Sequence, residues 1–565
     1  MSKTTGLTNG ILLALGTALA LGAIAMPVLN PDLYWHLSAG RFMTEHLRLP
    51  AADFLSWTEY GSPWTDFEWL SQLVFYAAHT LAGKAGFFIL KMLLLGATLP
   101  VFYRLLSLYS LEDSAFFALP LWGLAIFPNS DLRPENFSVF FFALLLWRLE
   151  KARLSGGAFS GGRRTYLWTA AIFALWANLH AGFVYGLLLL FFYAAGAYAD
   201  RRLFHSGTGP GPERTFFKAG LAASAATLLN PWGYKIYAVL LAHLSDADLV
   251  RKYLAEWAPA SLGNPWHWPY MVFLLLSFSL LLSRFFREKS FPAAHLPALS
   301  YFAFAAAGHE RHIAFFSMAA LAFSFEALAN EPAWKKKMKP AGAAALAAAL
   351  LYLSLAVWPV YSGLRHDLGE ESAGAAAYLK AETPGLGGRR LYNPWNWGGY
   401  LGWALSPEYR VFVDGRYLFH KYLAPLSEAM ADQQTWDRFA SERGFGLVLF
   451  RRDNALAPFK YGGGAVLRPA YLVFMPEEKW ALVYWDKAAL LFARRPVRTG
   501  EFRLVRPGDA KYLKLELCDG RLKKKDAQRE LDLYKRLPAP ERPAEIAYLE
   551  KWLAAFPAVC KEPGY

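Results

Sequence analysis

Long uncharged runs divide the first two thirds of the chain and constrain its fold more than any other feature. The first of them, NGILLALGTALALGAIAMPVL (9–29), contains no charged residue. Later runs are roughly 15 to 22 residues long, enough to cross a hydrocarbon core about 30 Å thick. Over the whole chain 55% of the residues are hydrophobic and 18% are charged, which is too apolar for a water-soluble protein of 565 residues. The sequence therefore predicts an α-helical polytopic membrane protein.

The first run is also longer than the apolar part of a secretion signal, usually about 7 to 15 residues, and no small-residue cleavage site follows it. We expect a retained first helix.

Cys518 and Cys560 are the only cysteines, and both lie near the C-terminus. This spacing suggests neither a metal cluster nor a disulfide framework, although a single disulfide between the two stays open.

Basic residues give the chain a formal net charge of +14, but they do not indicate nucleic-acid binding. They gather in short clusters between the apolar runs, as expected for loops on the cytoplasmic side of a membrane. These clusters are KARLSGGAFSGGRR (151–164), DRRLFHSGTGPGPERTFFK (200–218), RFFREK (284–289) and WKKKMK (334–339).

If the basic loops are cytoplasmic, the polar breaks between them are external, because successive spanning helices cross the membrane in opposite directions. The external breaks are 127–138, 178–182, 230–268 and 308–312. A consistent count requires one apolar segment that does not cross. We therefore predict two helices lying in the external interface, over 33–47 and 66–83, within a first external loop over 30–85. About eleven spanning helices remain, and the last of them, 340–361, delivers the C-terminal part outside.

The composition changes after a predicted transmembrane domain over 1–361. Residues 362–520 alternate between likely helices and strands, which predicts an external α/β domain. Residues 521–565 are predicted to form a helical hairpin. The expected helices of the α/β domain are GAAAYLKAE and WDRFASERG, and the expected strands are RVFVDGR, LVLFRR, WALVYWD and ALLFARR.

Ionisable residues of the membrane part collect on the predicted external side. Such groups are costly at membrane depth and usually mark a pathway or a site. Carboxylates such as Asp32 and Glu68 can act as a general base or bind a divalent ion. Arginine and histidine can neutralise a phosphate. The residues concerned are Asp32, His36, Arg41, Asp66, Glu68, Asp131, Arg133, Glu135, His180, Glu256, His309, Glu310, Arg311 and His312.

Two simpler interpretations compete with this site. A charge just outside a helix end is often only a solvated interfacial residue. His180 can be a buried histidine bonded to Asn178 or to the backbone. Asp32 favours the functional interpretation more than the other acids, because Pro31, Tyr34 and Trp35 surround it in place of a polar loop.

Several motifs resemble those of the GT-C membrane glycosyltransferases. NPDLYWHLSAGRFM and ADFLSWTEYGSPW (52–64) are similar to the first-loop segments of the catalytic subunit of oligosaccharyltransferase. NPWNWGGYLGWALSPEYRVFVDGRY (393–417) begins like its acceptor-recognition motif WWDYGY, but lacks the acid. YWHL (34–37), WANLHAGF (176–183), LNPWG (229–233) and ERHI (310–313) are similar to motifs of a broad set of bacterial membrane proteins. The resemblance covers most of residues 9–417.

This resemblance implies roles for individual residues. Asp32 matches the first-loop acid that acts as base or metal ligand, and Glu68 is the second catalytic candidate. Asp131 and Glu135 stand where a second acidic motif occurs, so Asp32, Asp131 and Glu135 would bind Mg²⁺ or Mn²⁺. The donor phosphate would contact Arg133, Arg311, His180 and His312. The acceptor would contact Asn396, Tyr400, Asp414 and Arg416.

The predicted protein is a glycosyltransferase of the bacterial cytoplasmic membrane. It would take a sugar from a polyprenyl-phosphate-linked donor at the outer face and pass it to a glycan, lipid or protein acceptor. A non-catalytic scaffold that binds a lipid-linked glycan or a secreted partner is the alternative. A transporter is disfavoured, because the charges gather at one face and transporters bind their substrates near the midplane.

Overall fold

The computed structural model describes residues 3–155, 163–203, 212–288, 292–329, 332–358, 370–452, 456–461, 464–476 and 478–497, with isolated residues between 518 and 558. The predicted hairpin over 521–565 lies outside the continuous segments. Cys518 is disulfide-bonded, and Cys560 lies outside the described residues.

The chain forms two compact units. Unit 1 contains Met1–Ala51 and Trp64–His366, and unit 2 contains Ala52–Pro63 and Asp367–Tyr565. Residues 52–63, predicted as part of the first external loop, therefore belong to the second unit.

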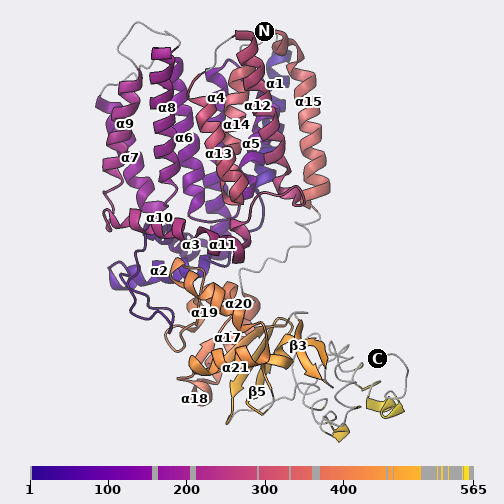
Figure 1. Cartoon of the computed structure of the whole chain (residues 1–565). Helices are drawn as coiled ribbons and strands as arrows, with labels where there is room; N and C mark the ends of the chain where they lie inside the picture. Colours follow the sequence, from indigo (N-terminus) through magenta and orange to yellow (C-terminus); the bar gives the residue numbers. More distant parts are fainter. Residues whose placement is uncertain are drawn as a thin grey trace. The chain divides into compact units, whose positions relative to one another are not determined.

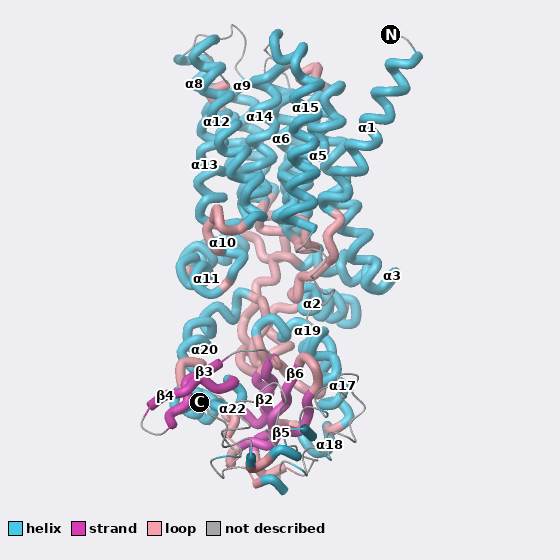
Figure 2. Tube along the Cα trace, turned by 90° about the vertical axis from the view of Figure 1, so that its right-hand side faces the viewer, coloured by secondary structure: helices cyan, strands magenta, loops and turns pink. Residues whose placement is uncertain are grey.

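Unit 1 is a bundle of apolar helices with shorter helices at one end. Its helices are α1 (Lys3–Ile24), α2 (Leu33–His46), α3 (Trp69–Gly96), α4 (Thr98–Leu108), α5 (Ala115–Ile126), α6 (Glu135–Leu154), α7 (Arg163–Leu179), α8 (Phe183–Leu203), α9 (Pro212–Ala226), α10 (Lys235–Ser245), α11 (Ala247–Tyr253), α12 (Trp268–Glu288), α13 (His295–Gly308), α14 (Ile313–Ala329) and α15 (Pro332–Tyr352). The helices α2, α10 and α11 gather at the end opposite the one where α1 begins (Figure 1, Figure 2). We call this the α2 end of the bundle.

Among the described residues, five segments are long and apolar enough to cross a membrane. They are Trp69–Leu108, Phe183–Arg202, Pro265–Glu288, Glu310–Ala329 and Pro340–Val357. The prediction of a mainly helical chain with apolar helices is confirmed, and the count of about eleven spans stays a prediction.

The predicted interfacial helices correspond to α2 and to the first part of α3. The regular helix of α3 is interrupted at Ala82 and Gly83. Gly83 has φ +57°, a left-handed conformation that glycine adopts without a steric penalty. The first part of α3 therefore ends where the predicted 66–83 segment ends, and a second apolar part follows it.

A buried ionic network, not predicted from the sequence, joins helices of the bundle. Glu150 of α6 accepts hydrogen bonds from Tyr109 (2.8 Å) and Tyr193 (2.5 Å), and its Oε1 lies 2.9 Å from His295 Nε2. Arg153 pairs with both Glu150 and Glu326. These contacts pair the buried charges with one another.

Unit 2 contains a four-stranded sheet in the order β1-β2-β6-β5 and a separate β3-β4 hairpin. In the four-stranded sheet β1 pairs with β2 in parallel, and the β2-β6 and β6-β5 pairs are antiparallel. The strands are β1 (Arg390–Tyr392), β2 (Phe445–Arg451), β3 (Leu456–Tyr461), β4 (Gly464–Pro469), β5 (Trp480–Trp485) and β6 (Ala489–Arg494). The helices are α17 (Ala373–Ala381), α18 (Thr383–Leu386), α19 (Gly398–Leu405), α20 (Leu423–Ala429), α21 (Gln433–Glu442) and α22 (Ala470–Phe474).

Alternation along β2 separates the two cores of this unit, because successive strand side chains point to opposite faces. Val448 and Phe450 join the core that contains Trp436 of α21. Leu447 and Leu449 join the core that contains residues of α17 and α19. The predicted strand RVFVDGR is not a ladder strand: it makes one isolated bridge, between Val411 and Ser56.

Candidate functional site

The predicted external polar residues of unit 1 lie at the ends of its helices, in segments that meet at the α2 end. Asp32 precedes α2, and Glu68 immediately precedes α3. Arg133 lies in the loop before α6, and Glu135 is the first residue of that helix. The other members are His180, which follows α7, Glu256 in the turn Ala255–Trp257, and Arg311 in the turn Glu310–His312.

Arg133 and Arg311 are bridged by one carboxylate. Arg133 Nη1 forms a hydrogen-bonded ion pair with Glu256 Oε2. Arg311 Nη1 lies 3.5 Å from the other oxygen, Glu256 Oε1. All three side chains are partly exposed, Arg133 by 25%, Arg311 by 27% and Glu256 by 29%. A ligand can therefore reach them. A single two-oxygen anion thus spans both guanidinium groups. We call Arg133 and Arg311 the arginine pair.

Further contacts orient this pair. Arg311 Nε lies 3.7 Å from Glu135 Oε2, and its guanidinium lies 5.5 Å from the Trp257 ring centroid. Burial lowers the pKa of Arg133, but Glu256, Asp32 and Asp131 outweigh it and the net shift is upward. Arg133 therefore stays charged, and the field of Asp32 reaches it.

Glu68 differs from the other acids in its protonation. Burial raises its pKa to about 8, helped by Asp66, Asp32 and Glu135, while Arg311 acts in the opposite direction. At neutral pH most Glu68 side chains are therefore protonated. A neutral carboxyl can donate a hydrogen bond but is a poor base, which changes the role predicted for this residue.

His180 is held in one tautomer by its neighbours. Its Nδ1 accepts a hydrogen bond from the Gly182 amide (3.0 Å) and lies 2.7 Å from Ser138 Oγ, which accepts from Trp176 Nε1. The ring proton of the neutral imidazole is therefore on Nε2, which lies 3.8 Å from Glu68 Oε1. Burial lowers the pKa of His180 to about 3, so the ring is neutral. It can donate a hydrogen bond but cannot neutralise a phosphate as a cation.

His312 is not available as a phosphate contact, contrary to the prediction. Its Nε2 is hydrogen-bonded to the Tyr185 hydroxyl, and its Nδ1 lies 3.2 Å from the Ala305 carbonyl oxygen. Both ring nitrogens are therefore engaged in helix packing.

The predicted metal set of Asp32, Asp131 and Glu135 is not assembled. Both oxygens of Asp131 accept from the Leu29 amide, and Oδ1 also accepts from the Leu132 amide. Glu135 faces Arg311. Within the part of the chain that the structure describes, no group of three or more His, Cys, Asp or Glu side chains could hold a metal ion. The prediction of Mg²⁺ or Mn²⁺ on these residues therefore does not fit the observed donor set.

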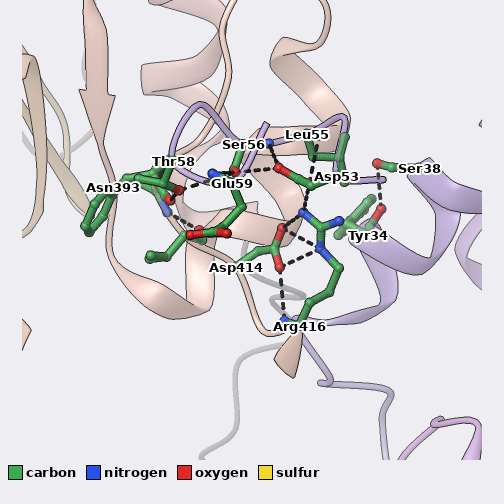
Figure 3. Close-up of polar contacts among 12 residues, drawn as sticks. Tyr34, Ser38, Asp53, Leu55, Ser56, Thr58, Glu59, Asn393, Asp414 and Arg416 are labelled. Carbon is green, nitrogen blue, oxygen red and sulfur yellow. Dashed lines mark hydrogen bonds and ion pairs between the residues drawn. The ribbon is translucent and has the colours of Figure 1, made fainter. Parts of the chain in front are cut away.

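Asp414 and Arg416 form a buried ionic triad with Asp53, within unit 2 (Figure 3). Arg416 Nη2 lies 2.6 Å from Asp53 Oδ1 and 2.7 Å from Asp414 Oδ2. Arg416 is 2% exposed and Asp414 is fully buried. The prediction that these two residues contact an acceptor is wrong for this structure, because their polar atoms face Asp53 and each other.

Hydrogen bonds from the same region fix residues 52–63 in the second unit. Ser56 Oγ donates to Asp53 Oδ2 (2.5 Å), and Tyr422 donates to Glu59 Oε1 (2.6 Å). Burial raises the pKa of Glu59, but Lys421 and Tyr422 outweigh it and lower the pKa overall. The VFVDGR motif therefore anchors a loop of the first half of the chain.

The remaining predicted acceptor residues stay candidates. Asn396 is exposed in the turn Trp395–Trp397, and Tyr400 is half-buried in α19. Among the groups that sequence reasoning undervalued, Glu256 was only a weak candidate. Its signal was an acid in AEWAP, within an external break, and the bridge to both arginines could not be predicted from that signal.

No protein-family model matches the chain, and no curated protein matches it in sequence. Solved structures do match. Archaeal oligosaccharyltransferase AglB from Archaeoglobus fulgidus, in complex with an inhibitory peptide and a dolichol-phosphate, has a TM-score of 0.58 at 11% identity, over 100% of this chain and 87% of that one. The chain has the GT-C fold.

Two further structures of the Archaeoglobus fulgidus oligosaccharyltransferase agree with this assignment. The form tethered to an acceptor peptide containing the NVT sequon has a TM-score of 0.52 at 13% identity, over 78% of this chain and 69% of that one. The complex with Zn and sulfate has a TM-score of 0.51 at 12% identity, over 96% of this chain and 83% of that one. The predicted resemblance is thereby confirmed at the level of the fold.

Proposed function

We propose that the chain transfers a sugar from a polyprenyl-phosphate-linked donor to an acceptor at the outer face of a bacterial cytoplasmic membrane. One observation carries the proposal: Glu256 bridges Arg133 and Arg311 with its two oxygens. A phosphate presents the same pair of anionic oxygens, and guanidinium groups bind such oxygens strongly. The dolichol-phosphate bound to AglB supports a lipid phosphate as the ligand.

The reaction assigns one task to each group. The bond between the anomeric carbon of the sugar and the phosphate oxygen breaks, and a bond from that carbon to the acceptor oxygen or nitrogen forms. The acceptor proton passes to Asp32. The lipid departs as polyprenyl phosphate, whose negative charge the arginine pair stabilises. Asp32 suits the base role because it is half-buried and its charge acts on Arg133.

Glu68 and His180 complete the site as neutral hydrogen-bond donors. A protonated Glu68 adds no negative charge against the incoming phosphate, although Asp66, Asp32 and Glu135 surround it. His180 presents its Nε2–H toward Glu68.

Transfer measured with purified protein in proteoliposomes tests this function. The donor is a polyprenyl-phosphate-linked sugar, and glycan, lipid and peptide acceptors are supplied in turn. We expect Asp32→Asn to lose transfer while donor binding stays within about twofold, since the substitution keeps the shape and removes only the base. Asp248→Asn, an acid on α11 whose side chain is 98% exposed, is the matched control and should behave as wild type.

Two outcomes would count against the proposal. Transfer by Asp32→Asn at the wild-type rate would remove the assigned mechanism. Donor binding by the wild-type protein without turnover of any acceptor would favour the non-catalytic scaffold.

A further inference from the structure

Residues 25–32 connect α1 to α2 and end on Asp32, so the path of their backbone sets the position of that carboxylate. The segment is not helical from Ala25 to Asn30, and much of it is buried: Met26 is 7% exposed and Asn30 is 2% exposed. Buried backbone amides and carbonyls need hydrogen-bond partners. In a non-helical segment the regular hydrogen bonds of a helix do not supply all of these partners.

Side chains from two other elements supply them. Lys91, a fully buried residue of α3, donates from Nζ to the Met26 carbonyl oxygen. Asp131 accepts from the Leu29 amide, with Oδ1 at 3.1 Å and Oδ2 at 3.3 Å. The segment is thus held by a buried lysine and by a partly buried aspartate.

Asn30 continues these contacts to Asp32. Its Nδ2 donates to the Leu132 carbonyl oxygen (3.1 Å), and its Oδ1 accepts from the Asp32 amide (3.1 Å). Asp131 Oδ1 also accepts from the Leu132 amide at 2.7 Å. The loop that contains Asp131 and Leu132 therefore fixes the backbone on both sides of Asn30.

The same loop connects to the arginine pair. The Arg133 amide donates to Asn136 Oδ1 (2.9 Å), and Asn136 Nδ2 donates to the Asn129 carbonyl oxygen (2.7 Å). Asn129 Nδ2 in turn donates to the Arg311 carbonyl oxygen (2.9 Å). One loop thus sets the places of Asp32, Arg133 and Arg311 relative to one another.

We propose that Asp131 and Lys91 are positioning residues that clamp residues 25–32 and hold Asp32 at the arginine pair. The structural part of this proposal stands on its own contacts, and its effect on catalysis rests on the proposed function. It also gives the acid of the second external loop a task other than metal binding.

Substitutions at Asp131 separate a positioning role from a chemical one. Oδ1 makes both close contacts, to the Leu29 and Leu132 amides. Asn offers an acceptor oxygen at that place, whereas Ala offers none. We expect Asp131→Asn to keep kcat within about fivefold of wild type and Asp131→Ala to lower it about 100-fold, because a misplacement of roughly 1 Å can cost that much. The donor KM should change less than kcat in both variants.

Lys91→Met tests the other side of the clamp, because Met has a similar length and no donor. It should lower kcat in the same way as Asp131→Ala. The double variant Lys91→Met/Asp131→Ala should be less impaired than the product of the two single effects, since both release the same segment.

Hydrogen exchange measured by mass spectrometry supplies a readout that does not depend on activity. Peptides covering residues 25–34 of the full-length protein should exchange faster in Asp131→Ala and Lys91→Met than in wild type and Asp131→Asn. Equal loss of kcat in Asp131→Asn and Asp131→Ala would overturn the proposal in favour of a chemical or metal-binding carboxylate. Unchanged exchange in Asp131→Ala would overturn it as well. Faster exchange in a protein that transfers no sugar would sustain the clamp while the proposed function fails.

Discussion

Two arginine clusters of this chain contain the same chemical groups but differ in their exposure and in their distances to carboxylates. Arg416 in unit 2 is 2% exposed and lies 2.6 and 2.7 Å from two carboxylates. The arginine pair in unit 1 keeps about a quarter of its exposure, and Arg311 reaches its carboxylates only at 3.5 and 3.7 Å. A buried cation in close contact with two carboxylates holds structure together, whereas a partly exposed cation such as Arg311, with longer contacts, can exchange its partner for a ligand.

The largest difference between the two clusters is expected when the buried Arg416 is replaced. Arg416→Met leaves Asp53 and Asp414 buried without their cation, so we expect unit 2 to lose about 3–5 kcal/mol of unfolding free energy. Pulse proteolysis of the full-length protein, followed through cleavage within residues 370–497, measures this loss. Arg410→Met is the control, because Arg410 is exposed and stacks on Tyr60, with an expected cost of about 0.5–1 kcal/mol. Equal effects of the two substitutions would show that the triad does not stabilise the unit.

Substitution in the arginine pair should affect the ligand more than the fold. Arg311→Gln and Arg133→Gln each remove a charged hydrogen-bond donor, worth about 1.5–3 kcal/mol, so the donor KM should rise about 10- to 100-fold. Steady-state kinetics at varied donor concentration measures it. Arg251→Gln on α11, an arginine with 43% exposure, should leave the KM unchanged. A change in thermal stability with an unaltered KM would place these arginines in the same class as Arg416.

Glu68 makes donor affinity depend on pH. Below its pKa of about 8 the side chain is neutral, and above it a new negative charge appears near Arg311. The donor KM should therefore rise about five- to tenfold between pH 7 and 9, which corresponds to roughly 1–1.4 kcal/mol of repulsion. Glu68→Gln should flatten this part of the profile. An unchanged rise in the variant would assign the titration to another group.

Glu256 competes with the donor phosphate for the arginine pair. Glu256→Gln keeps the size of the side chain and removes the competing charge, so the donor KM should fall about two- to fivefold. The effect is small because partly exposed ion pairs contribute about 0–1 kcal/mol. A higher KM in the variant would instead make Glu256 a contact of the donor or the acceptor.

Sequence reasoning predicted the parts of the site that depend on local patterns. Asp32, Arg133 and Arg311 stand out as charges at the ends of apolar runs, because the cost of charge in a bilayer makes such positions informative. The partners could not be predicted, since they come from distant parts of the chain. Asp53 and Arg416 are 363 residues apart.

The misassigned residues show that contacts made in the folded chain cannot be predicted from residue type alone. Asp414 and Arg416 form a charged motif of the kind that binds ligands, and only their burial reveals a structural role. Asp131 occupies the expected place of a metal ligand, but two backbone amides already occupy its oxygens. Residue type and spacing cannot distinguish an available carboxylate from an engaged one.

Direct binding of polyprenyl phosphate tests the central claim that the arginine pair is a lipid-phosphate site. Native mass spectrometry would compare polyprenyl phosphate with the uncharged polyprenol on the wild-type protein and on the Arg133→Gln/Arg311→Gln variant. We predict that wild type retains the phosphate lipid and not the alcohol, and that the double variant loses this preference. Equal retention of polyprenyl phosphate by the wild type and the double variant would show that the arginine pair is not the lipid-phosphate site.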